Sequence, residues 1–394
     1  MATTVLSGSP LVATPVYNKM LFKVSGSLIA QPNYRYVCDV KNPAGTTLAR
    51  LKCDKLPTTN FGFFDVAKVV ETLIAPTKPS LTQTGFVDHA GYYSGYRLDF
   101  MEEYGNTPVV QTGTVTTVSG NVAFAGNLEQ LEFQDWTISP YFRIEQSFPS
   151  TRALTSQRTF TVYHGGSAWL AINATKYQAV APNDTWLVSG RVTYKGVDYD
   201  IAVSPSLSGT TDFNIQRFAC GPAQLSGTIA ALSGAVEGDS YTVRFYSSTT
   251  AQSAGNVVTF TFGPCERFNS IPVHFQNKYG GIDSYTFTLK NRKRANITRQ
   301  TFGYNSDVYA TTTYDKVWAG EFDYVYALNS DWLTDAESAW LIEMIRSGQV
   351  WLELDGQLVE AIVNANTYQF TTRRNDRLTQ LQVEVAVAYK NNIL

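Results

Sequence analysis

The chain has 394 residues, of which 13% are aromatic and only 16% are charged, against roughly 25% charged residues in an ordinary globular protein. Its 31 Lys and Arg nearly balance its 33 Asp and Glu, so no bulk field would draw it onto nucleic acid or an anionic membrane, and we expect neither partner. It contains no run of about 18 apolar residues and no basic, apolar leader, so we expect synthesis in a cytoplasm without membrane insertion.

Aromatic and β-branched side chains suit the pleated, half-buried surface of a sheet, so the composition predicts a mainly β protein. The length exceeds what one hydrophobic core usually serves, so we expect several small β-sandwich or barrel modules in series with a C-terminal α+β module. Turn residues and changes of pattern divide the chain into modules at residues 1–112, 113–219, 220–290 and 291–394.

The first module is expected to contain strands and one short helix. Residues 96–102 alternate apolar and polar side chains, which predicts a strand with one buried face. Asp65 can accept the free amides of a first helical turn, which predicts a helix over residues 66–73.

The cysteines are too few and too scattered for a disulfide scaffold. In the predicted N-terminal hairpin Cys38 faces Ala49, which leaves Cys53 roughly 13 Å away, beyond the ~7 Å Cα limit of a bridge. We therefore expect buried free thiols at both positions. Whether Cys220 pairs with Cys265 stays open at this stage.

The two middle modules show short alternating runs separated by Gly, Ser, Pro and Asn. Residues 113–219 have the spacing of a sandwich or barrel. Residues 220–290 are expected to form a fibronectin-like or immunoglobulin-like module, with strands over 227–232, 241–246 and 257–262.

The same module is expected to end in a hairpin with a Gly-Gly turn. Gly280 and Gly281 permit a positive φ in a tight turn, and the carboxylate of Asp283 can cap the free amides of that turn. His274 alternates with apolar neighbours in the first strand of the hairpin, so it is expected to face solvent.

The last module carries the clearest helix signal of the chain. Thr334 and Glu337 form a capping box, in which each side chain satisfies an amide at the start of the helix. Gly348 stands where a left-handed residue would end this helix. Asp355 and Gly356 are the pair that a type I′ hairpin turn prefers.

Reactive chemistry has little support in the sequence. His89, His164 and His274 are far apart and His164 is placed in a turn, so we expect no metal site. Glu102 and Glu103 are adjacent in a strand and point to opposite faces, so they cannot flank one bond. Nucleotide-binding and hydrolase motifs are missing, so we expect no cofactor and no enzyme, although a Ser/His/Asp site assembled by folding stays an alternative.

Two groups of residues are candidates for binding a partner. One places four cations within five residues: Lys290, Arg292, Lys293 and Arg294. Because this cluster follows a strand and precedes a predicted loop, it indicates a solvated junction between modules, or alternatively a surface that grips an acidic partner. The other group is Tyr92 and Tyr93 in a Gly-rich loop, which are candidates for stacking on a glycan.

Residues 277–287 read N-K-Y-G-G-I-D-S-Y-T-F. This segment resembles the N-R-L-G-G-x-D-x-F-x-F signature of virion proteins of tailed bacteriophages, especially those infecting Bacteroidota, with Lys278 and Tyr279 in place of Arg and Leu. Segments 64–66, 102–105 and 333–341 are similar to other parts of that family.

The resemblance implies a structural protein of the tail, baseplate or neck, such as a ring, hub or adaptor. Such a protein is located in the virion after assembly in the host cytoplasm, and its partners are copies of itself and other virion proteins. The resemblance assigns no catalytic residues to this chain. It implies structural roles for the motif residues Asn277, Gly280, Gly281, Asp283, Thr334 and Glu337.

Two alternatives remain at this stage. A receptor-binding adhesin of a tail or head fibre would use Tyr92 and Tyr93 to bind a host surface glycan. A carbohydrate-active enzyme would need two acids from different strands converging in a cleft, about 5 to 9 Å apart.

Overall fold

The computed structural model confirms the mainly β class, since strand accounts for 53% and helix for 11%, in several separate sheets. The structure describes these residues: 4–5, 13–134, 153–173, 188–203, 215–247, 257–264, 270–304, 314–364, 380–389 and 391–393. Among them, no helix combines the length and the apolar character needed to cross a membrane.

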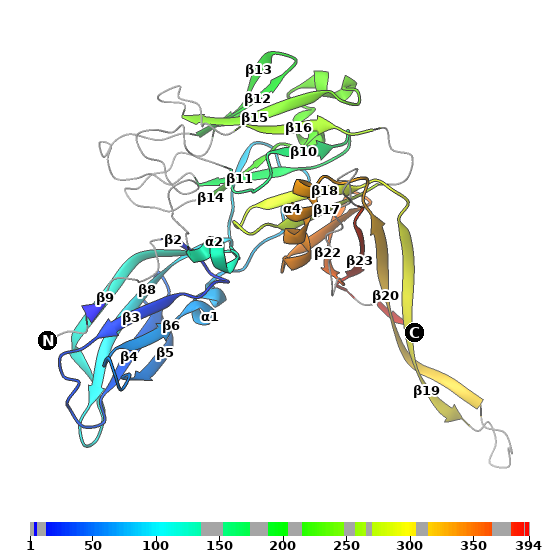
Figure 1. Cartoon of the computed structure of the whole chain (residues 1–394). Helices are drawn as coiled ribbons and strands as arrows, with labels where there is room; N and C mark the ends of the chain where they lie inside the picture. Colours follow the sequence, from blue (N-terminus) through cyan, green and yellow to red (C-terminus); the bar gives the residue numbers. More distant parts are fainter. Residues whose placement is uncertain are drawn as a thin grey trace, which may run out of the picture.

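Two sheets pack together in the N-terminal part (Figure 1). The larger contains, in bonding order, β2 (Ala13–Pro15), β9 (Val109–Phe124), β8 (Tyr93–Tyr104), β4 (Arg35–Lys41) and β5 (Thr47–Asp54). The smaller contains β1 (Thr4–Val5), β3 (Leu21–Ser25) and β6 (Gly62–Asp65). The ring of Phe100 on β8 lies 5.9 Å from the rings of Phe22 and Phe64 on the smaller sheet, which forms a shared core. Because β9 continues to Phe124, the predicted boundary at residue 112 falls inside a strand.

The predicted first helix is present as α1 (Ala67–Val70) continued by the 3₁₀ turn η1 (Glu71–Leu73). The Asp65 carboxylate accepts hydrogen bonds from the backbone amides of Ala67 at 3.1 Å and Met20 at 3.2 Å. Asp65 therefore satisfies a first-turn amide as predicted, but it lies one residue before the N-cap, which is Val66, and it also ties the helix start to the chain before β3.

The N-terminal cysteines are free thiols, but their register differs from the prediction. Lys41 pairs with Thr47, one residue later than expected, and a β-bulge between Val40 and Lys41 adds one more residue, so Cys38 lies opposite Leu51 instead of Ala49. Cys38 is buried, whereas Cys53 is only half-buried. Cys220 is a buried free thiol, and Cys265 lies outside the described residues.

The middle of the chain forms two further sheets (Figure 1). One contains β10 (Thr159–Val162), β16 (Val258–Phe262), β15 (Ser240–Ser247), β12 (Val188–Tyr194) and β13 (Val197–Val203). The other contains β11 (Trp169–Asn173), β14 (Ile215–Ala219) and β7 (Phe86–Asp88). Since β7 belongs to the first 112 residues, the N-terminal segment completes a sheet of the middle part.

Short helical turns connect these strands: α2 (Gln130–Gln134), α3 (Pro222–Leu225) and η3 (Ala230–Gly234). The predicted strand over 227–232 is therefore wrong. That segment caps the core with Ile229 and Leu232, whose spacing of three suits a helical turn and not a strand.

The C-terminal sheet has eight strands. In bonding order it contains β18 (Ile282–Phe287), β17 (Ile271–Gln276), β21 (Val350–Leu354), β22 (Gln357–Val363), β23 (Gln382–Val387), β20 (Tyr314–Asn329) and β19 (Arg292–Tyr304), with β24 (Asn391–Ile393) also beside β20. Strands β17 and β18 belong to this sheet, whereas β15 and β16 belong to a middle sheet. The segment 220–290 is therefore divided between two sheets and does not form the expected fibronectin-like module.

Helix α4 (Asp335–Arg346) joins the C-terminal sheet to the middle part. Its buried Trp340 lies edge-on to Phe160 of β10, with ring centroids 5.4 Å apart, and 5.6 Å from Phe275 of β17. The predicted capping box is confirmed, because the Thr334 hydroxyl accepts from the Glu337 amide and the Glu337 carboxylate accepts from the Thr334 amide.

The two turns after this helix differ in outcome. Gly348 does not adopt a positive φ, because the helix ends with Ser347 in an extended conformation. Asp355 (φ 49°) and Gly356 (φ 73°) form the predicted left-handed pair between β21 and β22.

The capping box gives a first test. We expect Thr334→Ala to lower the free energy of unfolding by about 1 kcal/mol, because it leaves a first-turn amide of α4 without its acceptor. Thr334→Ser keeps the hydroxyl and should stay close to the parent protein. Urea denaturation of the three proteins measures the difference, and equal midpoints for Ala and Ser would contradict it.

Candidate functional site

The Gly-Gly turn between β17 and β18 is held by Asn277. The Asn277 side-chain oxygen accepts hydrogen bonds from the backbone amides of Tyr279 at 3.0 Å and Gly281 at 2.9 Å. Gly280 has the positive φ of 79° that the sequence predicts. The cap expected from Asp283 is thus supplied by Asn277, which precedes the turn.

Gly281 is required for a different reason. Its φ is not positive, but a Cβ atom at this position would lie 2.2 Å from the Leu154 carbonyl oxygen and 2.9 Å from the Asn277 side-chain nitrogen. The turn is therefore pressed against segment 153–157, and only a residue without a side chain fits.

Asp283 is the centre of a buried network. Its carboxylate accepts hydrogen bonds from Trp340 Nε1 at 2.8 Å, Thr155 Oγ1 at 2.9 Å and Asn277 Nδ2 at 2.9 Å. These donors come from α4, from segment 153–157 and from the turn, so one carboxylate joins three parts of the chain. Burial, and then the nearby charge of Glu343, raise the pKa of Asp283 to about 7, although the three donors act in the opposite direction.

This raised pKa gives a pH prediction. Between pH of about 4 and 7 the folded protein holds a proton on Asp283 that the unfolded chain releases, so the contribution of this group to stability falls as pH rises through that window and is constant above it. A shift of about three pKa units corresponds to roughly 4 kcal/mol.

Asp283→Asn cannot titrate, so the free energy of unfolding should fall less steeply over this window than in the parent protein. The raised pKa of the largely buried Glu343 side chain acts in the same direction and remains in both proteins. Urea denaturation at a series of pH values measures the two slopes, and equal slopes would contradict the assignment.

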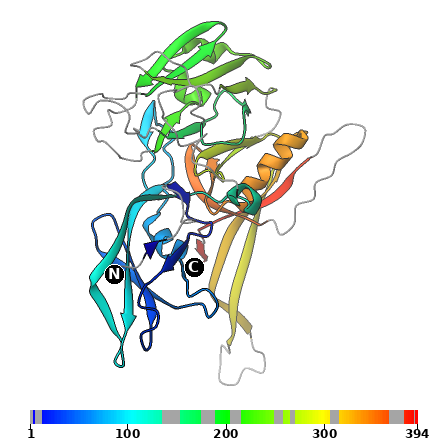
Figure 2. The same cartoon turned by 60° about the vertical axis from the view of Figure 1, so that its left-hand side comes forward.

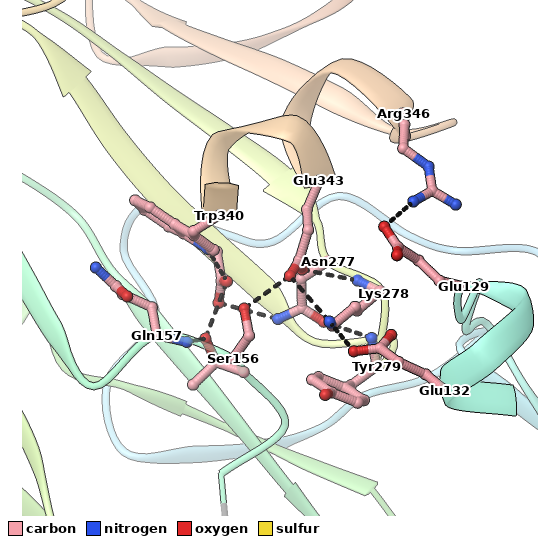
Figure 3. Close-up of polar contacts among 12 residues, drawn as sticks. Glu129, Glu132, Ser156, Gln157, Asn277, Lys278, Tyr279, Trp340, Glu343 and Arg346 are labelled. Carbon is pink, nitrogen blue, oxygen red and sulfur yellow. Dashed lines mark hydrogen bonds and ion pairs between the residues drawn. The ribbon is translucent and has the colours of Figure 1, made fainter. Parts of the chain in front are cut away.

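A charged rim surrounds the network (Figure 3). Lys278 Nζ lies 2.5 Å from a carboxylate oxygen of Glu132 on α2. The backbone amide of Lys278 donates to the Glu343 carboxylate at 3.1 Å. Ser156 Oγ donates to Glu343 at 2.7 Å. We call this set of contacts around Asn277, Asp283 and Trp340 the junction.

The junction connects the β17–β18 turn to α2, to α4 and to segment 153–157. The Asp283 carboxylate accepts from the Asn277 amide group, the Glu343 carboxylate accepts from the Lys278 amide, and the cavity beside Lys278 and Glu343 has a volume of about 200 Å³. Within the described ranges, no three His, Cys, Asp or Glu side chains come close enough to hold a metal ion. The contacts of Thr155, Trp340 and Glu343 were missed in the sequence because their partners are more than 50 residues away.

Tyr92 cannot bind a glycan, because it is fully buried. Its ring stacks on His89 with the centroids 3.6 Å apart, while the hydroxyl of Tyr93 donates to Asp88 at 2.9 Å. The Gly-rich loop that suggested exposure is covered by the β17–β18 turn, since His89 Nε2 lies 3.0 Å from the Gly280 carbonyl oxygen. Burial, and then the charge of Arg217, lower the pKa of His89, so a neutral ring donates to this carbonyl.

The other two histidines have different outcomes. His274 is buried and not solvent-facing, because Ser284 lies 2.8 Å from its Nδ1, Glu353 lies 3.2 Å from its Nε2, and Trp169 packs on its ring. The alternation rule failed here because both faces of β17 are covered. His164 lies in a turn, as predicted.

The basic cluster lies on a strand and not before a loop. Lys290 precedes β19, and the other three cations are its first residues. The ammonium of Lys293 lies 3.8 Å from the ring centroid of Tyr324, and Arg294 forms an ion pair with Glu384 on the opposite face of the sheet. Whether the cluster binds a partner stays a prediction.

Strands β19 and β20 continue beyond the body as a projecting ribbon (Figures 1 and 2). We call this ribbon, Arg292–Tyr304 with Tyr314–Asn329, the arm. Its strands have 13 and 16 residues, and in the described residues β23 and β24 pair with β20 only from residue 320 onward. The outer part of the described arm, residues 300–304 and 314–319, therefore has two strands.

The outer part of the arm carries exposed apolar side chains. Trp318 is 66% exposed, and Phe302 and Val317 are 44% and 46% exposed; Ile297, nearer the body, is 49% exposed. Trp318 is the extra residue of a β-bulge, because Gln300 pairs with Ala319 and Thr301 pairs with Val317. Sequence reasoning missed the arm, because nothing in an alternating strand says whether its apolar face is covered.

Comparisons with known proteins assign the chain to no family: no family model matches it, and a search of curated proteins found no match. The function is therefore inferred from the arm, the junction and the chemistry of the residues.

Proposed function

We propose that this chain is a structural subunit of a tailed-bacteriophage virion, an oligomeric ring, hub or adaptor of the tail, baseplate or neck. It acts by protein–protein assembly and not by catalysis. The observation that carries this proposal is the arm, which places large apolar side chains in solvent at a distance from the body.

The physics of the arm favours an assembled state. A two-stranded ribbon without further cover is marginally stable in water. A long edge strand also presents outward backbone groups that invite another strand. Burying Trp318 and its neighbours against an adjoining subunit removes apolar surface from water and gives the ribbon a third partner.

The resemblance of residues 277–287 to virion proteins supports the same function. Asn277, Gly280, Gly281 and Asp283 all serve to fasten the turn to neighbouring segments. These structural roles fit a family for which catalytic residues are not expected. The junction would hold the body rigid while the arm reaches a neighbour.

A glycan-binding adhesin is a second candidate, on one observation. A cleft of about 520 Å³ lies between the middle and C-terminal sheets, lined by Tyr163, Phe262, Glu353 and Asp355 among others. Aromatic faces and carboxylates together suit the apolar and hydroxyl surfaces of a sugar. Glycan-array binding that is lost in Tyr163→Ala would favour this function over assembly.

The proposal is tested in infected host cells. Particles are purified on a density gradient, and their proteins are identified and quantified by mass spectrometry. We expect this chain to sediment with the particles in several copies each. Its presence only in the soluble fraction, with none in intact particles, would overturn the proposal.

A further inference from the structure

The edge strand of the arm is basic, chiefly in its first three residues. In the part of the chain that the structure describes, β19 is the last strand of its sheet, and residues 292–302 are all exposed. It carries four cations and no acid: Arg292, Lys293, Arg294 and Arg299. Two copies of β19 placed side by side would bring these like charges together, so the edge disfavours pairing with itself.

The chain contains an acidic edge that matches it. Strand β13 is the last strand of the five-stranded middle sheet and carries Asp198 and Asp200, both exposed, beside the exposed Val197. The two carboxylates lie on one face, because they are two residues apart in a strand. Arg191 of the neighbouring β12 lies 2.7 Å from Asp200 and 3.4 Å from Asp198.

The charged residues of the two edges have the same spacing, and in each strand they lie on the solvent face of the sheet. Arg292 and Arg294 are also two residues apart, so in either strand direction one arginine lies opposite each aspartate. These arginines share the solvent face with Glu384. Asp198 and Asp200 share the solvent face with Arg191, while the alternating Tyr199 and Ile201 pack toward the core.

We propose that β13 of one copy adds to β19 of a second copy, with Asp198 and Asp200 lying between Arg191 of their own sheet and Arg292 and Arg294 of the neighbour. The resulting sheet continues from one subunit into the next, solvent face with solvent face. Because two different edges meet, the contact is head-to-tail and generates a closed ring or a filament. This inference rests on the proposed assembly function and names its contact.

Charge reversal tests the contact on the full chain. The double variant Arg292→Glu with Arg294→Glu, and the double variant Asp198→Lys with Asp200→Lys, should each weaken self-association by roughly tenfold to a hundredfold, because two attractive cross-strand pairs become repulsive. A chain carrying all four changes should recover most of the association. Lys68→Glu with Lys78→Glu reverses two exposed cations elsewhere and should have no such effect. Sedimentation velocity over a concentration series measures all five proteins.

Three results would overturn the pairing. The parent protein stays monomeric at every concentration, the double variants associate as strongly as the parent, or the chain with all four substitutions does not regain self-association. In the last case the cations of β19 serve another partner or only keep the edge from aggregating. Each result is separate from the particle experiment above, in which the chain can be a virion protein whether or not these strands pair.

Discussion

Gly281→Ala is expected to be the most destabilising small substitution in this protein, lowering the free energy of unfolding by about 3 kcal/mol or more. The added methyl group would lie 2.2 Å from the Leu154 carbonyl oxygen and 2.9 Å from the Asn277 side chain. Neither can move freely, because the Asn277 side-chain oxygen accepts hydrogen bonds from the turn, and the Asn277 side-chain nitrogen donates both to Asp283 and to the Leu154 carbonyl oxygen. Urea denaturation, followed by Trp fluorescence, measures the loss.

The matched control is Gly348→Ala. A Cβ atom at Gly348 meets nothing within 4 Å, and its φ is not positive, so alanine should be tolerated with little change in stability. If Gly281→Ala and Gly348→Ala unfold at the same urea concentration, the junction is looser than these distances state.

Trp318→Ala is expected to have the largest effect on assembly. Buried tryptophans at the centre of an interface typically account for 2 kcal/mol or more, so association should weaken by about thirtyfold or more. The stability of the monomer should hardly change, because Trp318 is 66% exposed in the single chain. Sedimentation velocity measures the first effect and urea denaturation the second.

Trp332→Ala provides the control for this substitution. Trp332 is 57% exposed but precedes α4 on the body and not on the arm. It should assemble like the parent protein. Equal weakening by both changes would mean that general apolar exposure, and not the arm, drives association.

The parts of the fold that the sequence predicts correctly depend on local chemistry. The capping box of Thr334 and Glu337 and the turn at Asp355 and Gly356 each involve residues fewer than four positions apart, whose preferences are nearly independent of the rest of the chain. The strand over 96–102 is also present, but the prediction that one of its faces is wet is wrong, because Asp99 and Met101 are buried as well.

The arrangement of the strands could not be predicted in this way. Strand β7 pairs with β14 more than 120 residues later, and β17 leaves the module of its neighbours to join β21. A bulge after Val40 accounts for one of the two residues by which the partner of Cys38 differs from the prediction. Such pairings depend on long-range packing, which periodicity alone does not contain.

The candidate site shows the same division. The Gly280 turn follows from local backbone preference, but the exchange of roles between Asn277 and Asp283 depends on Thr155 and Trp340, which reach Asp283 only in the folded chain. Tyr92 is buried for a similar reason, since the β17–β18 turn covers its loop.

The most direct test of the central claim is a cryo-electron microscopy map of the assembled oligomer or of the intact particle, at a resolution that shows side chains. The account predicts that the arm of every copy is covered, with Trp318 buried against an adjoining subunit and a strand added along β19. Arms that extend into solvent in the assembled particle, with Trp318 uncovered, would contradict it.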